Sequence, residues 1–228
     1  MKIDNYYNSK KQIWLNVASS SDVLVDYVNL DNNIFLHALG LLDRFRWLVP
    51  RKYLSTIDSL VDAKKKALLV KHNCIKPLPL PDKSVDHILC SHFLEHVFPV
   101  EASAILTDFY RALKPNATLH VIVPDLRRYV DDYLERSNSF DPCAADVFIG
   151  ETILSNVQRG TLTYRLLELH GGFGLQHRWM YDNLSLEKIV TNAGFELADK
   201  KDFPSLSYRL NDGSVHCFCK KPMSSRAL

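Results

Sequence analysis

Short apolar runs alternate along the chain with longer segments in which apolar positions recur every three or four residues. The short runs are of strand length and rich in valine, isoleucine, leucine and aromatic residues, and they occupy 12–17, 27–30, 67–71, 85–90, 118–123 and 214–220. The helical spacing is found in 32–66, 102–113, 126–134 and 183–193. Segment 139–160 is expected to be helix and loop, and Gly194 predicts a helix C-cap. Alternating strands and helices predict an α/β chain with a doubly wound sheet.

The connection between the first two expected strands is unusually short. Only residues 18–26 separate them, whereas a parallel crossover normally needs about a dozen residues or more, usually including a helix. The connection is therefore either a compact non-helical loop or evidence against this pair of strands. Further along, Pro77, Pro79 and Pro81 predict an extended loop.

Composition excludes several classes of protein. The 228 residues are 46% hydrophobic and 24% charged, which is ordinary for one globular domain. A net charge of +2 argues against a dedicated nucleic-acid binder, and the absence of any apolar run of about 18 residues argues against stable membrane insertion. No signal-peptide core opens the chain, and the five cysteines have no paired metal spacing, so we expect reduced thiols and a cytoplasmic location. Oligomeric state is not addressed by these features.

Polar residues gather just past the ends of two expected strands. Ser91, His92, Glu95 and His96 follow the 85–90 strand, and Asp125 follows the 118–123 strand. In open α/β sheets ligands bind outside the carboxyl ends of the strands. We therefore expect the functional site at this edge.

Four sequence blocks carry a resemblance to a known family. They are PLPLPDKSVDHILCSHFLEHV, RALKP, LHVIVPDLRRYV and LEKIVTNAGFELAD. Together they make the chain resemble the class I S-adenosylmethionine-dependent methyltransferases, in particular the small type-11 group, over about residues 12–220. The resemblance implies a Rossmann-like, doubly wound, mostly parallel seven-stranded sheet with helices on both faces and a reversed last strand. It also implies one domain over 1–228, with a cofactor-binding half at 12–125 and acceptor-side helices, lid and last strands at 126–228.

In this family S-adenosylmethionine lies across the carboxyl ends of the first four strands. The glycine-rich loop that follows the first strand is represented here by Ala18, Ser19, Ser20 and Ser21, with no glycine. The small side chains would still allow close approach, and the hydroxyls would hydrogen-bond the methionine carboxylate. Asp31 holds the position that accepts hydrogen bonds from the ribose hydroxyls; the alternative is that it caps a following helix, and one residue could do both.

The third and fourth strands supply the remaining cofactor residues that the resemblance implies. Asn73 holds the position that faces the adenine amino group, or else is a turn residue. Ser91 and His92 would line the channel beside the methionine portion, or else form a polar strand end. The full set of expected cofactor-binding residues is Asn16, Ala18, Ser19, Ser20, Asp31, Asn73, Cys74, Ser91 and His92.

Methyl transfer is an in-line displacement, in which the protein mainly positions the partners and excludes water. A base is needed when the acceptor is a hydroxyl or a protonated amine, and His92, His96 and His177 are the candidates, each of which could instead be structural. The resemblance places His177 and Tyr181 at the substrate opening, behind a glycine-rich lid at 170–174; the alternative is a tight turn anchored by Trp179 and Tyr181.

Three other interpretations stay open. His92, Glu95 and His96 satisfy the H-x-x-E-H pattern of inverted zinc peptidases, with no third ligand marked out. The missing glycines allow a non-catalytic relative that has kept the fold. The basic-aromatic segment 44–52 would fit an acidic acceptor, a membrane surface or nucleic acid, or is a solvated helix face. We expect a methyltransferase without a metal, acting on an unidentified small-molecule or sugar-type acceptor.

Overall fold

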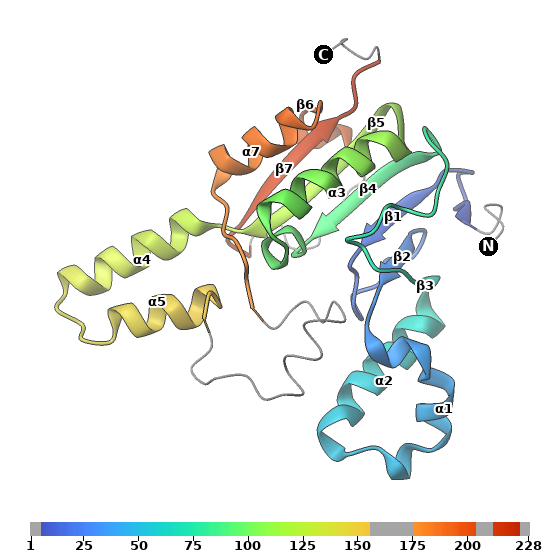
Figure 1. Ribbon diagram of the computed structural model, residues 1–228, viewed down its shortest axis with the longest axis horizontal. Coiled ribbons are helices and arrows are strands. Elements are labelled where there is room, and N and C mark those ends of the chain that lie inside the picture. The colour runs from blue at the N-terminus through green and yellow to red at the C-terminus, as the bar shows by residue number, and fades with distance from the viewer. Residues whose placement is uncertain (1–5, 156–175, 204–211, 224–228) are drawn as a thin grey trace.

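A seven-stranded sheet forms the centre of the molecule (Figure 1). The computed structural model describes residues 6–155, 176–203 and 212–223. Strand order is β3-β2-β1-β4-β5-β7-β6; β1 to β5 run parallel to one another, and β7 runs antiparallel to β5 and β6. The strands are β1 Trp14–Val17, β2 Val28–Asp31, β3 Leu69–Lys71, β4 Val85–Ser91, β5 Leu113–Pro124, β6 Glu196–Leu197 and β7 Ser214–Lys220. The predicted fold class, including the reversed last strand, is confirmed.

The helices follow the predicted apolar spacing. Pro50 breaks the 32–66 segment as expected and stands as the N-cap of its longest helix, while Gly194, with φ +97°, follows the C-cap of the last helix. The α-helices of the described residues are α1 Leu39–Arg44, α2 Arg51–Lys66, α3 Pro99–Ala112, α4 Leu126–Asn138, α5 Ala144–Thr152 and α7 Asn183–Asn192. The 3-10 helices are η2 Ile34–His37, η3 Arg46–Leu48, η4 Leu94–His96 and η5 Lys200–Asp202.

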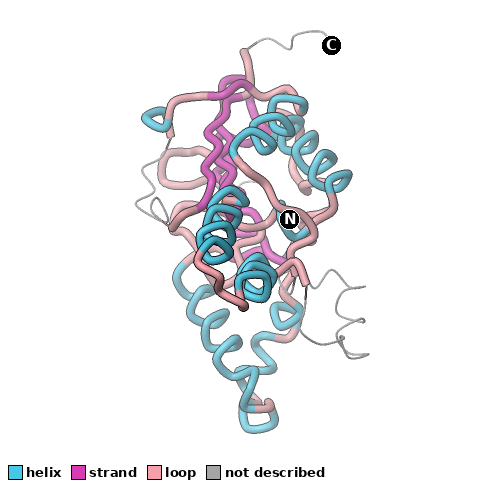
Figure 2. Tube along the Cα trace, turned by 90° about the vertical axis from the view of Figure 1, so that its left-hand side faces the viewer, coloured by secondary structure: helices cyan, strands magenta, loops and turns pink. Residues whose placement is uncertain are grey.

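The two faces of the sheet are covered differently. Successive side chains along each strand point to opposite faces, so alternate residues belong to different layers. On one face Ile88, Cys90, Val121 and Cys217 join the main core, together with the apolar stripes of α3 and α7, which lie in front of the sheet in Figure 1 and to one side of it in Figure 2. On the other face histidine and aromatic rings pack edge to face or stacked, in a row made by Trp14, Tyr27, His87, His120, Phe203 and Phe218.

The short connection after β1 is a compact loop, and the strands on either side of it are real. Residues 18–27 contain no helix, and β1 still pairs with β2 in parallel register, Leu15 opposite Val28. The fully buried Asn29 side chain holds the loop, because its Oδ1 accepts from the Leu24 amide and its Nδ2 donates to the Leu24, Tyr27 and Leu68 carbonyls. The hydrogen bonds of the buried Asn29 side chain therefore hold this connection together without a crossover helix.

Two helical pairs project from the carboxyl edge of the sheet. α1 and α2 follow β2, α4 and α5 follow β5, and they extend to opposite sides of that edge (Figure 1). Among the helices of the described residues, none combines the length and the apolar character needed to cross a bilayer.

Candidate active site

A pocket of about 160 Å³ lies at the carboxyl ends of β1 and β4. Six of the nine residues expected to bind cofactor line it, together with Asp22; the six are Asn16, Ala18, Ser19, Ser20, Ser91 and His92. Asp22 is a pocket residue that was not among the predicted ones, although an acidic side chain directly after the small residues of this loop was a signal for it. The loop and the fourth strand, 70 residues apart in the chain, meet because β1 and β4 are neighbours.

The loop after β1 has the backbone of a glycine loop without its glycines. Ala18 (φ 55°) and Ser20 (φ 50°) both lie in the left-handed region, where a side chain costs about 1–2 kcal/mol that glycine would not. Between them, the Ser19 side chain is buried at 5% exposure, and its Oγ has no hydrogen-bond partner. A buried hydroxyl without a partner, in a pocket wall, is the arrangement expected where a polar ligand completes the bonding.

Asp31 ties the end of β2 to this loop. Its two carboxylate oxygens accept the Ser20 amide at 2.7 Å and the Asn33 amide at 2.6 Å. Burial raises the pKa of Asp31, and the two amide hydrogen bonds oppose that shift. Asn33 in turn caps η2, so Asp31 supports the start of that helix while its carboxylate stays next to the pocket loop.

The other expected cofactor residues have structural partners. The Asn73 Oδ1 accepts the Ile75 amide at 3.2 Å, as in a turn. Cys74 is buried with its Sγ near the Leu30 and His72 carbonyls, and burial raises the pKa of its thiol to about 12. Asn16 lines the pocket, but its Nδ2 donates to Asp22 and Asn29. Neither Asn73 nor Cys74 lines this pocket, although the Cys74 thiol contacts the backbone of Ala18 in the pocket loop, and their assignment to the cofactor stays a prediction; Asn16 shapes the pocket.

His92 connects the pocket to a second polar cluster. Its backbone is left-handed, with φ 52°, and its amide donates to the Ile122 carbonyl. The ring lies between two carboxylates: Nδ1 is 3.3 Å from Glu95 Oε1, and Nε2 is 3.8 Å from Asp212 Oδ2 and 3.4 Å from Ser214 Oγ. Asp212 and Ser214 come from the far end of the chain, and the β5–β7 pairing brings them here.

The second cluster consists of Glu95, His96, His177 and Tyr181. Glu95 is fully buried, and His96 Nε2 lies 4.0 Å from its Oε1. The rings of His96 and His177 meet edge to face with centroids 4.8 Å apart. The Tyr181 hydroxyl is buried without a partner, and burial, reinforced by the charge of Glu95, raises its pKa to about 12.

Backbone bonds bring these residues together from distant parts of the chain. The Glu95 carbonyl accepts the amides of Arg178 and Trp179, and Tyr181 bridges to Asp125. His177 and Tyr181, predicted to lie at the substrate opening, are thus brought next to His96. Trp179, in contrast, is 49% exposed and does not anchor the segment to the core. The glycine-rich lid expected at 170–174 lies outside the described residues.

The zinc-peptidase pattern does not have its required backbone. Residues 92–96 lie on a strand end and a three-residue 3-10 helix, not on an α-helix, and His92 is left-handed. The Glu95 side chain is buried in the protein interior, and its Oε1 contacts Nδ1 of His92. The structure therefore gives no support to the peptidase interpretation of this motif.

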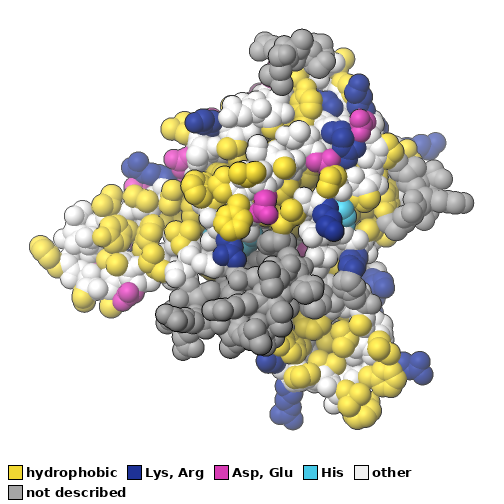
Figure 3. Space-filling view, viewed as in Figure 1, with side chains coloured by type: hydrophobic (Ala, Val, Ile, Leu, Met, Phe, Trp, Pro, Cys, Tyr) yellow, Lys and Arg dark blue, Asp and Glu magenta, His cyan; other side chains and the backbone are white. Residues whose placement is uncertain are grey.

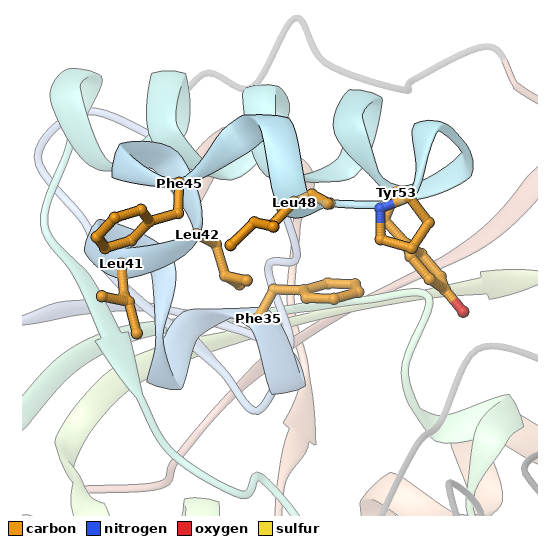
Figure 4. Close-up of a pocket in the computed structure, with 8 residues that line it drawn as sticks. Phe35, Leu41, Leu42, Phe45, Leu48 and Tyr53 are labelled. Carbon is orange, nitrogen blue, oxygen red and sulfur yellow. The ribbon is translucent and has the colours of Figure 1, made fainter.

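A separate apolar pocket of about 510 Å³ lies within the helical segment that follows β2 (Figure 4). Its lining is entirely apolar or aromatic and comprises Phe35, Leu41, Leu42, Phe45, Leu48, Val49, Pro50 and Tyr53. Hydrophobic side chains with basic ones at their margin are visible over this region in Figure 3. Arg46 pairs with Asp43 and Asp58, and Trp47 is 79% exposed. This pocket shares no lining residue with the one at the β1 and β4 ends.

The comparisons with known proteins agree with this architecture. Residues 55–121 match the methyltransferase domain family model of type 11. A solved S-adenosylmethionine-dependent methyltransferase from Methanosarcina mazei is 17% identical, with 98% of this chain and 99% of that chain covered and a TM-score of 0.54. A possible histamine N-methyltransferase from Thermotoga maritima is 14% identical, with 91% and 81% covered and a TM-score of 0.46. A search of curated proteins finds no match.

The fold shared with the Methanosarcina protein is the class I methyltransferase fold. The family model covers residues 55–121, from within α2 to within β5, and over that stretch the chain is similar to the type-11 methyltransferase domain. The resemblance seen in the sequence is thereby confirmed. Neither comparison identifies an acceptor.

Proposed function

We propose that this chain binds S-adenosylmethionine in the pocket at the ends of β1 and β4 and methylates a small polar acceptor, such as a sugar hydroxyl, that enters past the histidine cluster. The observation that carries the proposal is the buried Ser19 Oγ, which lines this pocket and lacks a partner. A non-catalytic relative that had lost the donor would have no reason to keep an unbonded hydroxyl there.

The size of the pocket indicates which part of the donor it takes. At about 160 Å³, it is smaller than the roughly 300–1,000 Å³ of complete ligand sites. The Ala18–Ser20 loop and Ser91 suit the methionine portion, and Asp22, which lines the same pocket, is an acidic residue that suits its ammonium group. Asp31, one hydrogen bond away through the Ser20 amide, suits the ribose hydroxyls.

Bound S-adenosylmethionine supplies an activated methyl group on a sulfonium, so the protein's part is positioning and proton removal. His92 is the best placed of the three candidate bases, because it lines the pocket and also contacts two carboxylates that would stabilise its imidazolium. His96 and His177, with Tyr181, lie beyond Glu95 as seen from His92, on the side where we expect the acceptor. We further propose that the enzyme is cytoplasmic, and the five cysteines without a disulfide support this location.

Calorimetric titration with S-adenosylmethionine and S-adenosylhomocysteine tests the proposal on the wild type, Ser19→Ala and Ser21→Ala. Because Ser19 Oγ bonds to nothing in the protein, Ser19→Ala should not lower the free energy of unfolding, yet it should weaken binding by about 0.5–1.5 kcal/mol, the value of a lost hydrogen bond. Ser21 does not line the pocket, so its variant should bind normally. Absence of binding to the wild type would favour the non-catalytic interpretation.

A further inference from the structure

We infer that Glu95, His96 and His177 form a binding site for a divalent transition-metal ion, of which zinc is the best match, immediately behind His92. One ligand atom from each residue lies within 4.8 Å of the others. Ligands about 2.0–2.2 Å from one tetrahedral ion lie roughly 3.3–3.6 Å apart, so side-chain rotations that bring the ligand atoms about 1 Å closer would close the site.

The buried carboxylate is the first argument for a cation. Glu95 has 0% exposure, and neither of its oxygens has a hydrogen-bond donor. His92 Nδ1 approaches Oε1 to 3.3 Å, a distance that suits an ion pair, but without the geometry of a hydrogen bond. A buried carboxylate needs positive charge or several donors around it. The protein supplies only part of this, and a divalent ion would supply the rest.

The second argument is the orientation of the two histidines. His96 Nδ1 lies 3.1 Å from the Gln176 carbonyl, which fixes the proton on Nδ1 and leaves the Nε2 lone pair on the side of Glu95. The His177 ring hydrogen-bonds the backbone of Thr152, while its Nδ1 is buried with no partner. Metal-binding histidines commonly donate their second ring N–H to a carbonyl in this way, which holds the free nitrogen toward the ion.

The donor set determines the class of ion. Two imidazoles and one carboxylate are the ligands of catalytic zinc sites and of non-haem iron sites, and three protein ligands leave a coordination position open. Neutral histidines with one carboxylate leave a net positive charge on the ion. An oxygen of the acceptor would be the natural occupant of the open position.

The site does not depend on the proposed methyl transfer, because metal binding is measurable without donor or acceptor. The full chain is stripped with a chelator, kept reduced and titrated with Zn²⁺ by calorimetry, and with Co²⁺ by visible absorption. The expected result is one equivalent of Zn²⁺ and a Co²⁺ spectrum typical of nitrogen and oxygen ligands. Glu95→Gln and His177→Ala should each weaken Zn²⁺ binding at least tenfold.

His216→Ala is the matched control, since His216 and His120 form the other close histidine pair, with their ring nitrogens 3.1 Å apart. This variant should bind Zn²⁺ as the wild type does. Thermal unfolding without metal checks that each variant folds; Glu95→Gln, which removes a buried charge, should unfold at the wild-type temperature or above. Three results would overturn the site: no stoichiometric uptake by the wild type, unchanged affinity in folded Glu95→Gln, or equal loss in His216→Ala.

Discussion

Replacing Asp31 by asparagine separates the two roles that its position gives it. The carboxylate accepts two backbone amides, from Ser20 at 2.7 Å and Asn33 at 2.6 Å. Asparagine keeps the shape but has only one oxygen, so one of these amides would face an NH₂ group. A hydrogen bond to a charged group contributes about 1.5–3 kcal/mol when buried. Because Asp31 is only partly buried, we expect a loss of about 1–2 kcal/mol in the free energy of unfolding.

Donor binding should fall by a separate amount. The ribose hydroxyls would lose one charged acceptor, which corresponds to about 1–3 kcal/mol, or roughly a 5- to 150-fold weaker affinity. Calorimetry with S-adenosylhomocysteine measures the affinity, and urea unfolding without ligand measures the stability. Asp26→Asn is the matched control, because Asp26 lies exposed in the same connection and the charge change is identical.

The two measurements distinguish the possible outcomes for Asp31. A variant that is less stable but binds with wild-type affinity would show that Asp31 only fastens the loop, and the assignment to the ribose would be wrong. A variant with wild-type stability would contradict the two amide contacts themselves. Weaker binding in the Asp26 control as well would point to a general charge effect in place of a specific contact.

Three further changes test other parts of the structure. Ser20→Gly should be more stable than Ser20→Ala by about 0.5–1 kcal/mol in urea unfolding, since glycine relieves the φ of 50° but loses more entropy on folding; the reverse order would contradict the left-handed backbone. Burial lowers the pKa of His87 and of His120 to about 3, below the value of about 6.5 in the unfolded chain. As the pH falls, the unfolded state therefore takes up protons first. The free energy of unfolding should decrease below about pH 6.5, by up to about 2.7 kcal/mol per pH unit for the two histidines together. His120→Phe, which can still stack on Phe218, should show about half that slope in urea midpoints between pH 7 and pH 5. Arg111→Lys should lower the free energy of unfolding by about 1–2 kcal/mol, because lysine cannot bond Asp82 and Asp108 together with the carbonyls of the proline loop. An unchanged urea midpoint would show that the hydrogen bonds of the Arg111 guanidinium contribute little to stability.

The sequence predicted most of the sheet, because a buried strand and the apolar stripe of a helix can each be recognised from the local spacing of apolar residues. β7 was predicted with its observed bounds, and β4 within one residue. β5 begins at Leu113, earlier than the predicted start at residue 118. Leu113 pairs with Val85 of β4, but residues 114–117, which include Pro115, have no apolar alternation that would predict a strand. The two-residue β6 was too short and too exposed to leave a pattern.

The site was only partly predictable, because some of its residues directly follow predicted strands whereas others reach it through the pairing of strands distant in the chain. The pocket residues follow strands directly, so position along the chain was enough to find Ser19, Ser91 and His92. Asp212 and Ser214 join them through the pairing of β5 with β7, which no local feature encodes. Asn73 and Cys74 were selected by position alone, and their side chains turned out to bond to neighbouring backbone groups.

The departures from the family pattern have a common physical consequence. The usual glycine loop and the helix after it are replaced by residues 18–27, in which Ala18 and Ser20 hold left-handed backbone without glycine. Such backbone persists only where surrounding contacts determine it, and here Asp31 and the buried Asn29 supply those contacts. The loop is therefore held in its shape before any ligand arrives, so that donor binding has little ordering entropy to overcome. A short, pre-organised loop thus replaces a flexible one, and we expect Asp31, which fastens this loop from outside the pocket, to be as important to donor binding as the residues that line the pocket.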